Sequence, residues 1–168
     1  LSALQFEQAN LVEMVIDTVE RHHIPPAMLT LEVTETTAMR NPDVSVAILE
    51  RLTQFGVKAS IDDFGTGYSS LLYLKRLPAS ELKIDGAFIN DLIAGSEDAS
   101  IVSAIIALGQ TLNLKVVAEG VETKEQAEFL AENGCKVIQG YLFSPAVSGS
   151  KFAAYLKEST TRIASALA

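Results

Sequence analysis

Hydrophobic residues occur along this chain in two alternating patterns. Short, mostly apolar runs predict strands, and the longer segments between them repeat apolar residues every three or four positions, which predicts amphipathic helices. Residues Leu1 to Leu4 have the pattern of the end of a strand. Further strands are expected at 29–33, 57–61, 81–84, 115–118 and 137–138.

The helical segments carry start and stop signals. Asn41 and Pro42 provide a cap and a first-turn proline, and Gly56 ends the same helix. Helices are expected at 6–21, 42–55, 69–76, 96–112, 123–133 and 150–156. In the second and fourth of these helices, the spacing predicts an inward face made of Val44, Ala47, Ile48, Leu52 and Phe55, and of Ile101, Val102, Ile105, Ile106, Leu108 and Leu112.

The alternation of strands and helices indicates an α/β fold with a parallel sheet, because parallel neighbours need a crossover connection. The chain has 168 residues, of which 48% are hydrophobic, so it can form one domain with a sizeable core. Length alone favours an open doubly wound sheet over a closed (β/α) barrel, which typically needs about 250 residues.

Composition narrows the class of protein. The net charge of −8, from 13 basic and 21 acidic side chains, argues against general attraction to nucleic-acid polymers or anionic lipid surfaces. The single cysteine, Cys135, has no partner for an internal disulfide, which fits a reducing compartment. No apolar run reaches the roughly 18 residues of a membrane span. We therefore expect a soluble domain.

Polar side chains stand at or just beyond the ends of five expected strands. These residues are Glu32, Asp62 and Asp63, Lys83, Glu119, and Gln139. The carboxyl ends of parallel strands in such a fold open onto one face, so these groups should converge on a single site.

The adjacent acids Asp62 and Asp63 are the most informative part of this pattern. Neighbouring carboxylates repel each other unless a cation is present, and oxygen ligands suit Mg²⁺ or Mn²⁺. With Glu32 and Glu119 they could hold two such ions. In the alternative interpretation, Asp62 caps the following turn and Asp63 faces water.

Five segments follow one another in a distinctive order: LEVTE (31–35), DDFGTGYSSL (62–71), LKID (82–85), VVAEGVE (116–122) and GCKVIQGYLFS (134–144). In order and spacing they resemble the signature segments of EAL-domain cyclic-di-GMP phosphodiesterases. The resemblance implies hydrolysis of cyclic di-GMP to linear pGpG with Mg²⁺ or Mn²⁺. It also replaces the open sheet by a TIM-like (β/α) barrel, here incomplete, with about six units and without the first strand and helix. A partial EAL domain would span residues 1–157, followed by a helical or frayed tail at 158–168.

The resemblance also implies a role for each strand-end residue. Glu32 resembles a ligand of the first metal, Asp62 the carboxylate shared by both metals, and Asp63 a ligand of the second. Glu119 resembles a further acid of the metal site. Lys83 resembles the cation that orients or activates the attacking water, and Gln139 the amide that holds metal-bound water and the substrate phosphate. Glu35 resembles the residue that anchors the loop at 64–70.

Some features of the family are missing. The family's first strand carries a Glu-Ala-Leu motif with a metal-binding Glu, and its next Asn ligand would fall just before Leu1. The usual basic residue of FS-[RK]-P is absent from Phe143-Ser144-Pro145-Ala146. We therefore expect little hydrolysis by this chain alone. The alternative is a degenerate module that binds cyclic di-GMP or dimerises without catalysis. A homodimer in the cytoplasm, within a larger signalling protein, would fit the family.

Overall fold

Five parallel strands form the centre of the molecule. The computed structural model describes residues 1–67, 70–92 and 95–156. The strands are β1 (Thr30–Thr34), β2 (Lys58–Phe64), β3 (Glu81–Ile84), β4 (Lys115–Ala118) and β5 (Val137–Ile138). They lie in the order β1-β2-β3-β4-β5, and every neighbouring pair is parallel. The α/β class is confirmed. Because each strand lies beside the next one in the chain, the topology is that of a (β/α) barrel segment and not of a doubly wound sheet.

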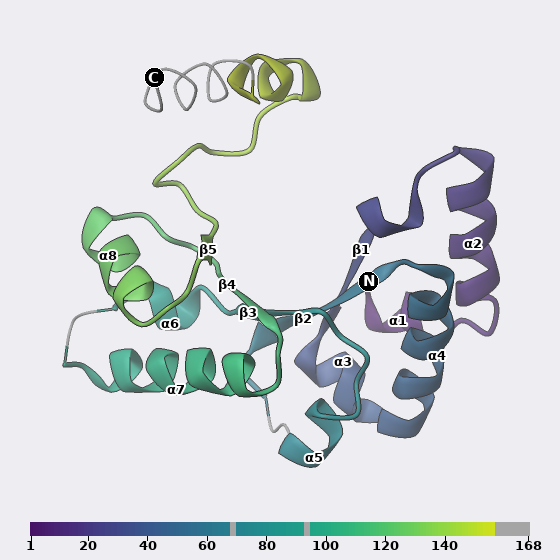
Figure 1. Ribbon diagram of the computed structural model, residues 1–168, viewed down its shortest axis with the longest axis horizontal. Coiled ribbons are helices and arrows are strands. Elements are labelled where there is room, and N and C mark those ends of the chain that lie inside the picture. Colours follow the sequence, from purple (N-terminus) through teal and green to yellow (C-terminus); the bar gives the residue numbers. More distant parts are fainter. Residues whose placement is uncertain (68–69, 93–94, 157–168) are drawn as a thin grey trace.

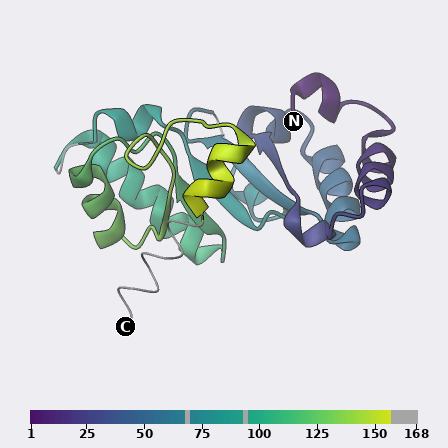
Figure 2. The same ribbon diagram turned by 90° about the horizontal axis from the view of Figure 1, so that it is seen from above.

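Helices connect the strands and cover one side of the sheet. Their bounds are α1 (Ala3–Phe6), α2 (Leu11–Arg21), η1 (Pro26–Met28), α3 (Glu35–Arg40), α4 (Pro42–Phe55), α5 (Leu71–Leu74), α6 (Ala87–Asn90), α7 (Glu97–Thr111) and α8 (Lys124–Glu132). Residues 149–156 are also helical. Contacts join α4 to β2 and α7 to β3 and β4. Figure 1 shows α5 and α7 below the strands and helical residues 149–156 above them, and Figure 2 shows the same arrangement from above.

The strand expected at Leu1 to Leu4 is wrong, because Ser2 caps helix α1, which begins at Ala3. The Ser2 side chain accepts a hydrogen bond from the Gln5 backbone N–H, and the Gln5 side chain accepts one from the Ser2 N–H. This capping box satisfies two backbone donors locally and so favours the helix over an extended chain. Five strands, rather than about six, therefore lie in the part of the chain that the structure describes.

The inward faces of two helices differ in part from the prediction. Val44 is 48% exposed and Ala47 is also exposed, whereas Ser45 and Leu49 of α4 are buried. In α7, Ile101 is 36% exposed, although its neighbour Val102 is fully buried. Apolar residues occur at nearly every position between 44 and 49, so their spacing does not define one face. The face is set instead by packing on the sheet.

The strands present alternate residues to two different environments. Val33, Ile61, Leu82, Ile84 and Ala118 are fully buried within the hydrophobic core. Successive residues of a strand point to opposite faces, so their polar neighbours Glu32, Ser60 and Lys83 project to the other face of the sheet. The site is therefore built on the face opposite this apolar core.

Candidate active site

Lys83 is at the centre of the polar face. Its side chain is only 6% exposed, and its Nζ lies 2.8 Å from Glu32 Oε1, 3.0 Å from Asp62 Oδ1 and 2.7 Å from Glu119 Oε1. Glu32 comes from the middle of β1, Asp62 from the carboxyl-terminal half of β2, and Glu119 directly follows β4. The structure therefore brings four of the residues singled out in the sequence into one cluster.

A β-bulge brings both adjacent aspartates to this cluster. In the pairing of β2 with β3, Ile61 lies opposite Leu82 and Phe64 opposite Ile84. Two residues of β2, Asp62 and Asp63, therefore occupy the space opposite Lys83 alone, as in other bulges. Asp63 has a φ of 53°, in the left-handed region, and its backbone N–H donates to Asp62 Oδ1 over 3.2 Å.

The bulge matters because a regular strand would send adjacent side chains to opposite faces. Here Asp62, Asp63 and Glu119 each offer a carboxylate oxygen, and the three oxygens lie within 4.8 Å of one another. Asp accepts the left-handed conformation more readily than most residues. The local turn thus converts two neighbours in sequence into neighbours on one side of the sheet.

The electrostatics of the cluster reflect crowded acids. Burial raises the pKa of Asp63, and the nearby charges of Asp62 and Asp85 raise it further. Burial also raises the pKa of Glu119, against the opposing effect of its hydrogen bond from Lys83. Both carboxylates are therefore harder to ionise than free acids. A divalent cation would relieve this cost.

The charged form of Lys83, in contrast, is favoured. Burial alone would lower the pKa of its ammonium group, but hydrogen bonds to Glu119, Glu32 and Asp62 outweigh burial and raise the pKa above its ordinary value. In the metal-free cluster Lys83 is therefore charged and donates hydrogen bonds to these acids.

The oxygen donors fit a hard divalent cation. Asp62, Asp63 and Glu119 supply carboxylate oxygens, the preferred ligands of Mg²⁺ and Mn²⁺, from positions close enough to share one ion. Glu32 lies at the same Lys83 ammonium but is not one of the three mutually close ligands, and its side chain is 48% exposed.

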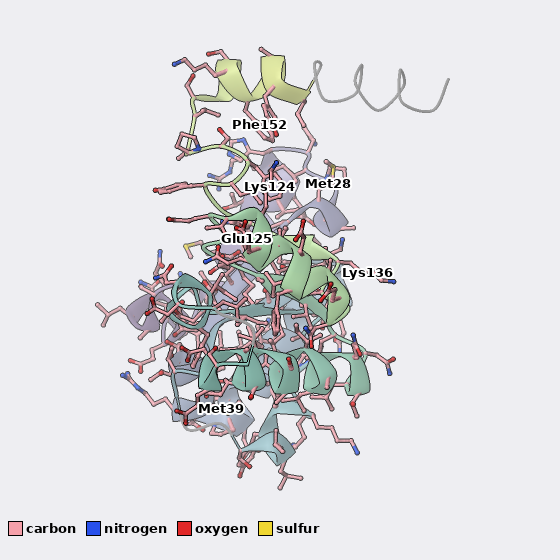
Figure 3. All side chains as sticks on the ribbon, turned by 90° about the vertical axis from the view of Figure 1, so that its left-hand side faces the viewer. Met28, Met39, Lys124, Glu125, Lys136 and Phe152 are labelled. Atoms are coloured by element: carbon pink, nitrogen blue, oxygen red, sulfur yellow. The ribbon has the colours of Figure 1, made fainter. Side chains whose placement is uncertain are left out.

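Gln139 follows β5 and is not among the residues that pair with Lys83 or offer the close carboxylate oxygens. It is exposed, and its backbone donates to Ala118 O and accepts from Val121 N–H. Its side chain lines a groove of about 690 Å³ between β3 to β5 and residues 140–155, shared with Tyr141 and Phe152. Figure 3 shows Phe152 below helical residues 149–156, on the side that faces the rest of the molecule.

Glu35 is buried at the start of α3, beneath the turn that follows β2. Its Oε2 accepts a hydrogen bond from the Gly65 N–H over 2.8 Å, and the residue is 1% exposed. Gly67 lies so close that an added Cβ would be 2.8 Å from Glu35 Oε1. These contacts tie the start of α3 to the first residues of the loop. Tyr68 and Ser69 of that loop lie outside the described residues.

A second polar layer lies two residues before the first along the strands, and the sequence reasoning missed it. Glu81 accepts hydrogen bonds from Ser60 Oγ at 3.4 Å and from Lys115 Nζ at 2.8 Å. The three residues are register partners on β2, β3 and β4. Their period of two relative to Asp62 and Lys83 is the signal that could have identified them.

Two findings together define the class of this protein: consecutive parallel strands of a (β/α) barrel, and a carboxylate cluster with a buried lysine at the carboxyl ends of those strands. The EAL domain family model matches residues 1–146. The chain belongs to the EAL domain family, whose fold is a TIM-like barrel.

Individual relatives agree with this assignment. The chain is 66% identical over 142 residues to the bifunctional diguanylate cyclase/cyclic di-GMP phosphodiesterase MucR of Pseudomonas aeruginosa, covering 84% of this chain and 21% of MucR. The solved structure of the PaMucR phosphodiesterase in complex with c-di-GMP matches with a TM-score of 0.88 and 61% identity, over 90% of this chain and 62% of that one.

A solved structure that contains manganese is also similar in fold to this chain. The Klebsiella pneumoniae BlrP1 structure with manganese and cyclic di-GMP has a TM-score of 0.75 and 34% identity, over 84% of this chain and 36% of that one. The chain thus spans about a fifth of the curated relative MucR. Among the described helices, none combines the length and the apolar character needed to cross a membrane.

Proposed function

We propose that this chain carries the active-site acids of a phosphodiesterase that hydrolyses cyclic di-GMP to pGpG with Mg²⁺ or Mn²⁺. The convergence of Asp62, Asp63 and Glu119 beside the buried Lys83 supports the proposal most directly. MucR, with which the chain shares 66% identity, is named as a cyclic di-GMP phosphodiesterase, and its complex with c-di-GMP has the same fold. MucR's cyclase activity is not part of the proposal, because the chain covers 21% of that protein.

In this proposal the acids Glu32, Asp62, Asp63 and Glu119 hold the metal. A bound divalent cation lowers the pKa of water and stabilises charge on the phosphodiester oxygens. Lys83 is charged and directed at the same point, so it orients the attacking water through a donated hydrogen bond. The Gln139 amide binds a phosphate oxygen from the end of β5. Glu35 holds the 63–67 turn through Gly65 and keeps Asp63 in position.

The test is metal-dependent hydrolysis by the natural protein that carries this sequence. Asp62→Asn removes a ligand charge with little change of shape, and we expect at least about a 100-fold loss of pGpG formation, since even residues that only support metal ligands cost 10–100-fold. The matched control is Asp17→Asn, an exposed aspartate on α2. Chromatography of cyclic di-GMP and pGpG across a Mn²⁺ titration measures both rates. Equal rates in the two variants would refute the ligand assignment.

A second candidate function is binding without cleavage. Pro145 stands where the resemblance leads one to expect a basic residue, so part of the contact with the nucleotide is weakened. The retained Lys83 cluster favours catalysis, because a purely sensing domain does not need a group to orient water. Calorimetric binding of cyclic di-GMP with no release of pGpG, in the presence of Mn²⁺, would favour the binding module.

The proposal also includes a homodimer in the cytoplasm. Light scattering of the purified protein measures its molecular mass and so tests whether it is a dimer.

A further inference from the structure

One ammonium group neutralises a cluster of acids on the polar face. Within residues 1–67, 70–92 and 95–156, Lys83 is the one basic side chain that forms ion pairs with Glu32, Asp62 or Glu119. Asp63 completes the group of carboxylates, and its oxygen lies within 4.8 Å of those of Asp62 and Glu119. Four carboxylates therefore face a single buried positive charge.

We propose that Lys83 is an internal counter-ion that holds the acid cluster together before metal binds, and that it competes with the metal for Asp62 and Glu119. The inference rests on the metal site of the proposed function but not on hydrolysis. Lys83 Nζ lies 3.0 Å from Asp62 Oδ1 and 2.7 Å from Glu119 Oε1. A divalent cation bound to the same two carboxylates has to share them with a like charge close by.

The positions of the acids do not depend on Lys83 alone. Asp62 and Asp63 are fixed by the bulge between Ile61 and Phe64, and Asp62 also accepts from the Asp63 N–H. Glu119 directly follows β4, and its backbone N–H donates to Ile84 O over 3.2 Å. The backbone therefore presents the ligands whether or not the ammonium is present. Removing the ammonium should free ligand oxygens without scattering the ligands.

Two opposite outcomes thus distinguish a competitor from a group that merely arranges the ligands. If Lys83 competes, Lys83→Met strengthens metal binding, because a repelling charge is lost and the acids are left without a cation. If Lys83 arranges the ligands, the same variant weakens metal binding. The metal-free protein should in either case lose stability, because Lys83→Met leaves the partly buried carboxylates of Asp62 and Glu119 without their counter-ion.

The experiment uses the natural protein that carries this sequence, with Mn²⁺ as the probe. Calorimetry measures Mn²⁺ affinity, and urea unfolding in EDTA measures stability without metal. For Lys83→Met we expect Mn²⁺ affinity to rise about tenfold or more, and the urea midpoint in EDTA to fall and to recover with Mn²⁺. The matched control is Lys115→Met, which removes a lysine that pairs with Glu81 on the same face. Its Mn²⁺ affinity should stay at the wild-type value.

Unchanged or weaker Mn²⁺ binding by Lys83→Met would overturn the inference, as would an unchanged or higher midpoint in EDTA. If Lys83→Met does not fold, the wild-type chain still provides a test. The NMR signal of the Lys83 Cε group should shift as Mg²⁺ saturates the site, and a signal that stays constant at saturation would overturn the inference.

The outcomes also separate this inference from the proposed function. Tighter Mn²⁺ binding by Lys83→Met without any pGpG formation by the natural protein would leave the competition standing and reject the phosphodiesterase. Normal pGpG formation by the natural protein, together with weaker Mn²⁺ binding by Lys83→Met, would support the phosphodiesterase and reject the competition.

Discussion

Gly140 is the position at which one added methyl group should most disturb the connection between β4 and β5. A Cβ at residue 140 would overlap the backbone nitrogen and carbonyl oxygen of Val121. Both Val121 groups are in use: its N–H donates to Gln139 O and its carbonyl accepts from Leu142 N–H, each over 3.0 Å. Backbone atoms held on both sides cannot move away as a flexible side chain could. The methyl group must therefore separate the two segments.

The expected cost follows from these contacts. Each lost hydrogen bond contributes about 1 kcal/mol to the free energy of unfolding, and forced overpacking costs about 1–3 kcal/mol. Replacing glycine also restricts the unfolded chain, which returns about 0.4–1 kcal/mol. We expect Gly140→Ala to lower the free energy of unfolding by about 2–4 kcal/mol net.

Urea unfolding followed by circular dichroism measures the effect. The matched control is Gly149→Ala, at the start of helical residues 149–156, because an added Cβ there meets nothing within 4 Å. The control should be neutral or stabilising by up to about 1 kcal/mol. If both variants unfold with free energies within about 0.5 kcal/mol of each other, the close approach of residue 140 to Val121 is not the constraint described.

Three other predictions concern charge, core and loop. In EDTA, Asp63→Asn should gain stability over the wild type as pH rises through the raised pKa of Asp63, because burial and neighbouring acids penalise the charged form in the folded state alone. Urea unfolding across pH tests this, and a difference that does not change with pH would contradict it. Leu82→Ala empties a fully buried site and should cost about 2–5 kcal/mol. Leu72→Ala, at 67% exposure, should cost less than about 0.5 kcal/mol, and similar losses would count against the assigned core. Glu35→Ala should speed hydrogen exchange of the Gly65 amide, which Glu35→Gln should still protect; equal exchange in both would reject this contact.

Much of the fold is predictable from the sequence, because the apolar runs and capping residues agree with the parallel topology of the sheet. The five strands at 29–33, 57–61, 81–84, 115–118 and 137–138 are confirmed within a few residues. The Thr123 capping box forms as expected, with its side chain accepting from the Gln126 N–H. The convergence of strand ends follows from parallel topology alone. The tail beyond Leu156 lies outside the described residues, so the predicted domain boundary stays a prediction.

The wrong predictions have local structural causes that the spacing of apolar residues along the sequence does not reveal. At Leu1 to Leu4, four apolar or small residues suit a strand, but the Ser2 capping box favours a helix. The burial of Ser45 in place of Val44 depends on how α4 packs. In the site, residue types indicated an acidic metal centre. The bulge that brings Asp63 alongside Asp62, and the three ion pairs of Lys83, depend on tertiary pairing and could not be predicted.

Asp63 has a left-handed backbone conformation, and this conformation does not require the negative charge of the side chain. Asparagine and glycine enter this conformation readily, whereas β-branched residues do so at a considerable cost. Replacement of Asp63 by asparagine can thus remove the negative charge while the backbone keeps the same turn. A domain with asparagine at residue 63 should therefore keep its fold while losing one of the three carboxylates that lie close enough to share an ion.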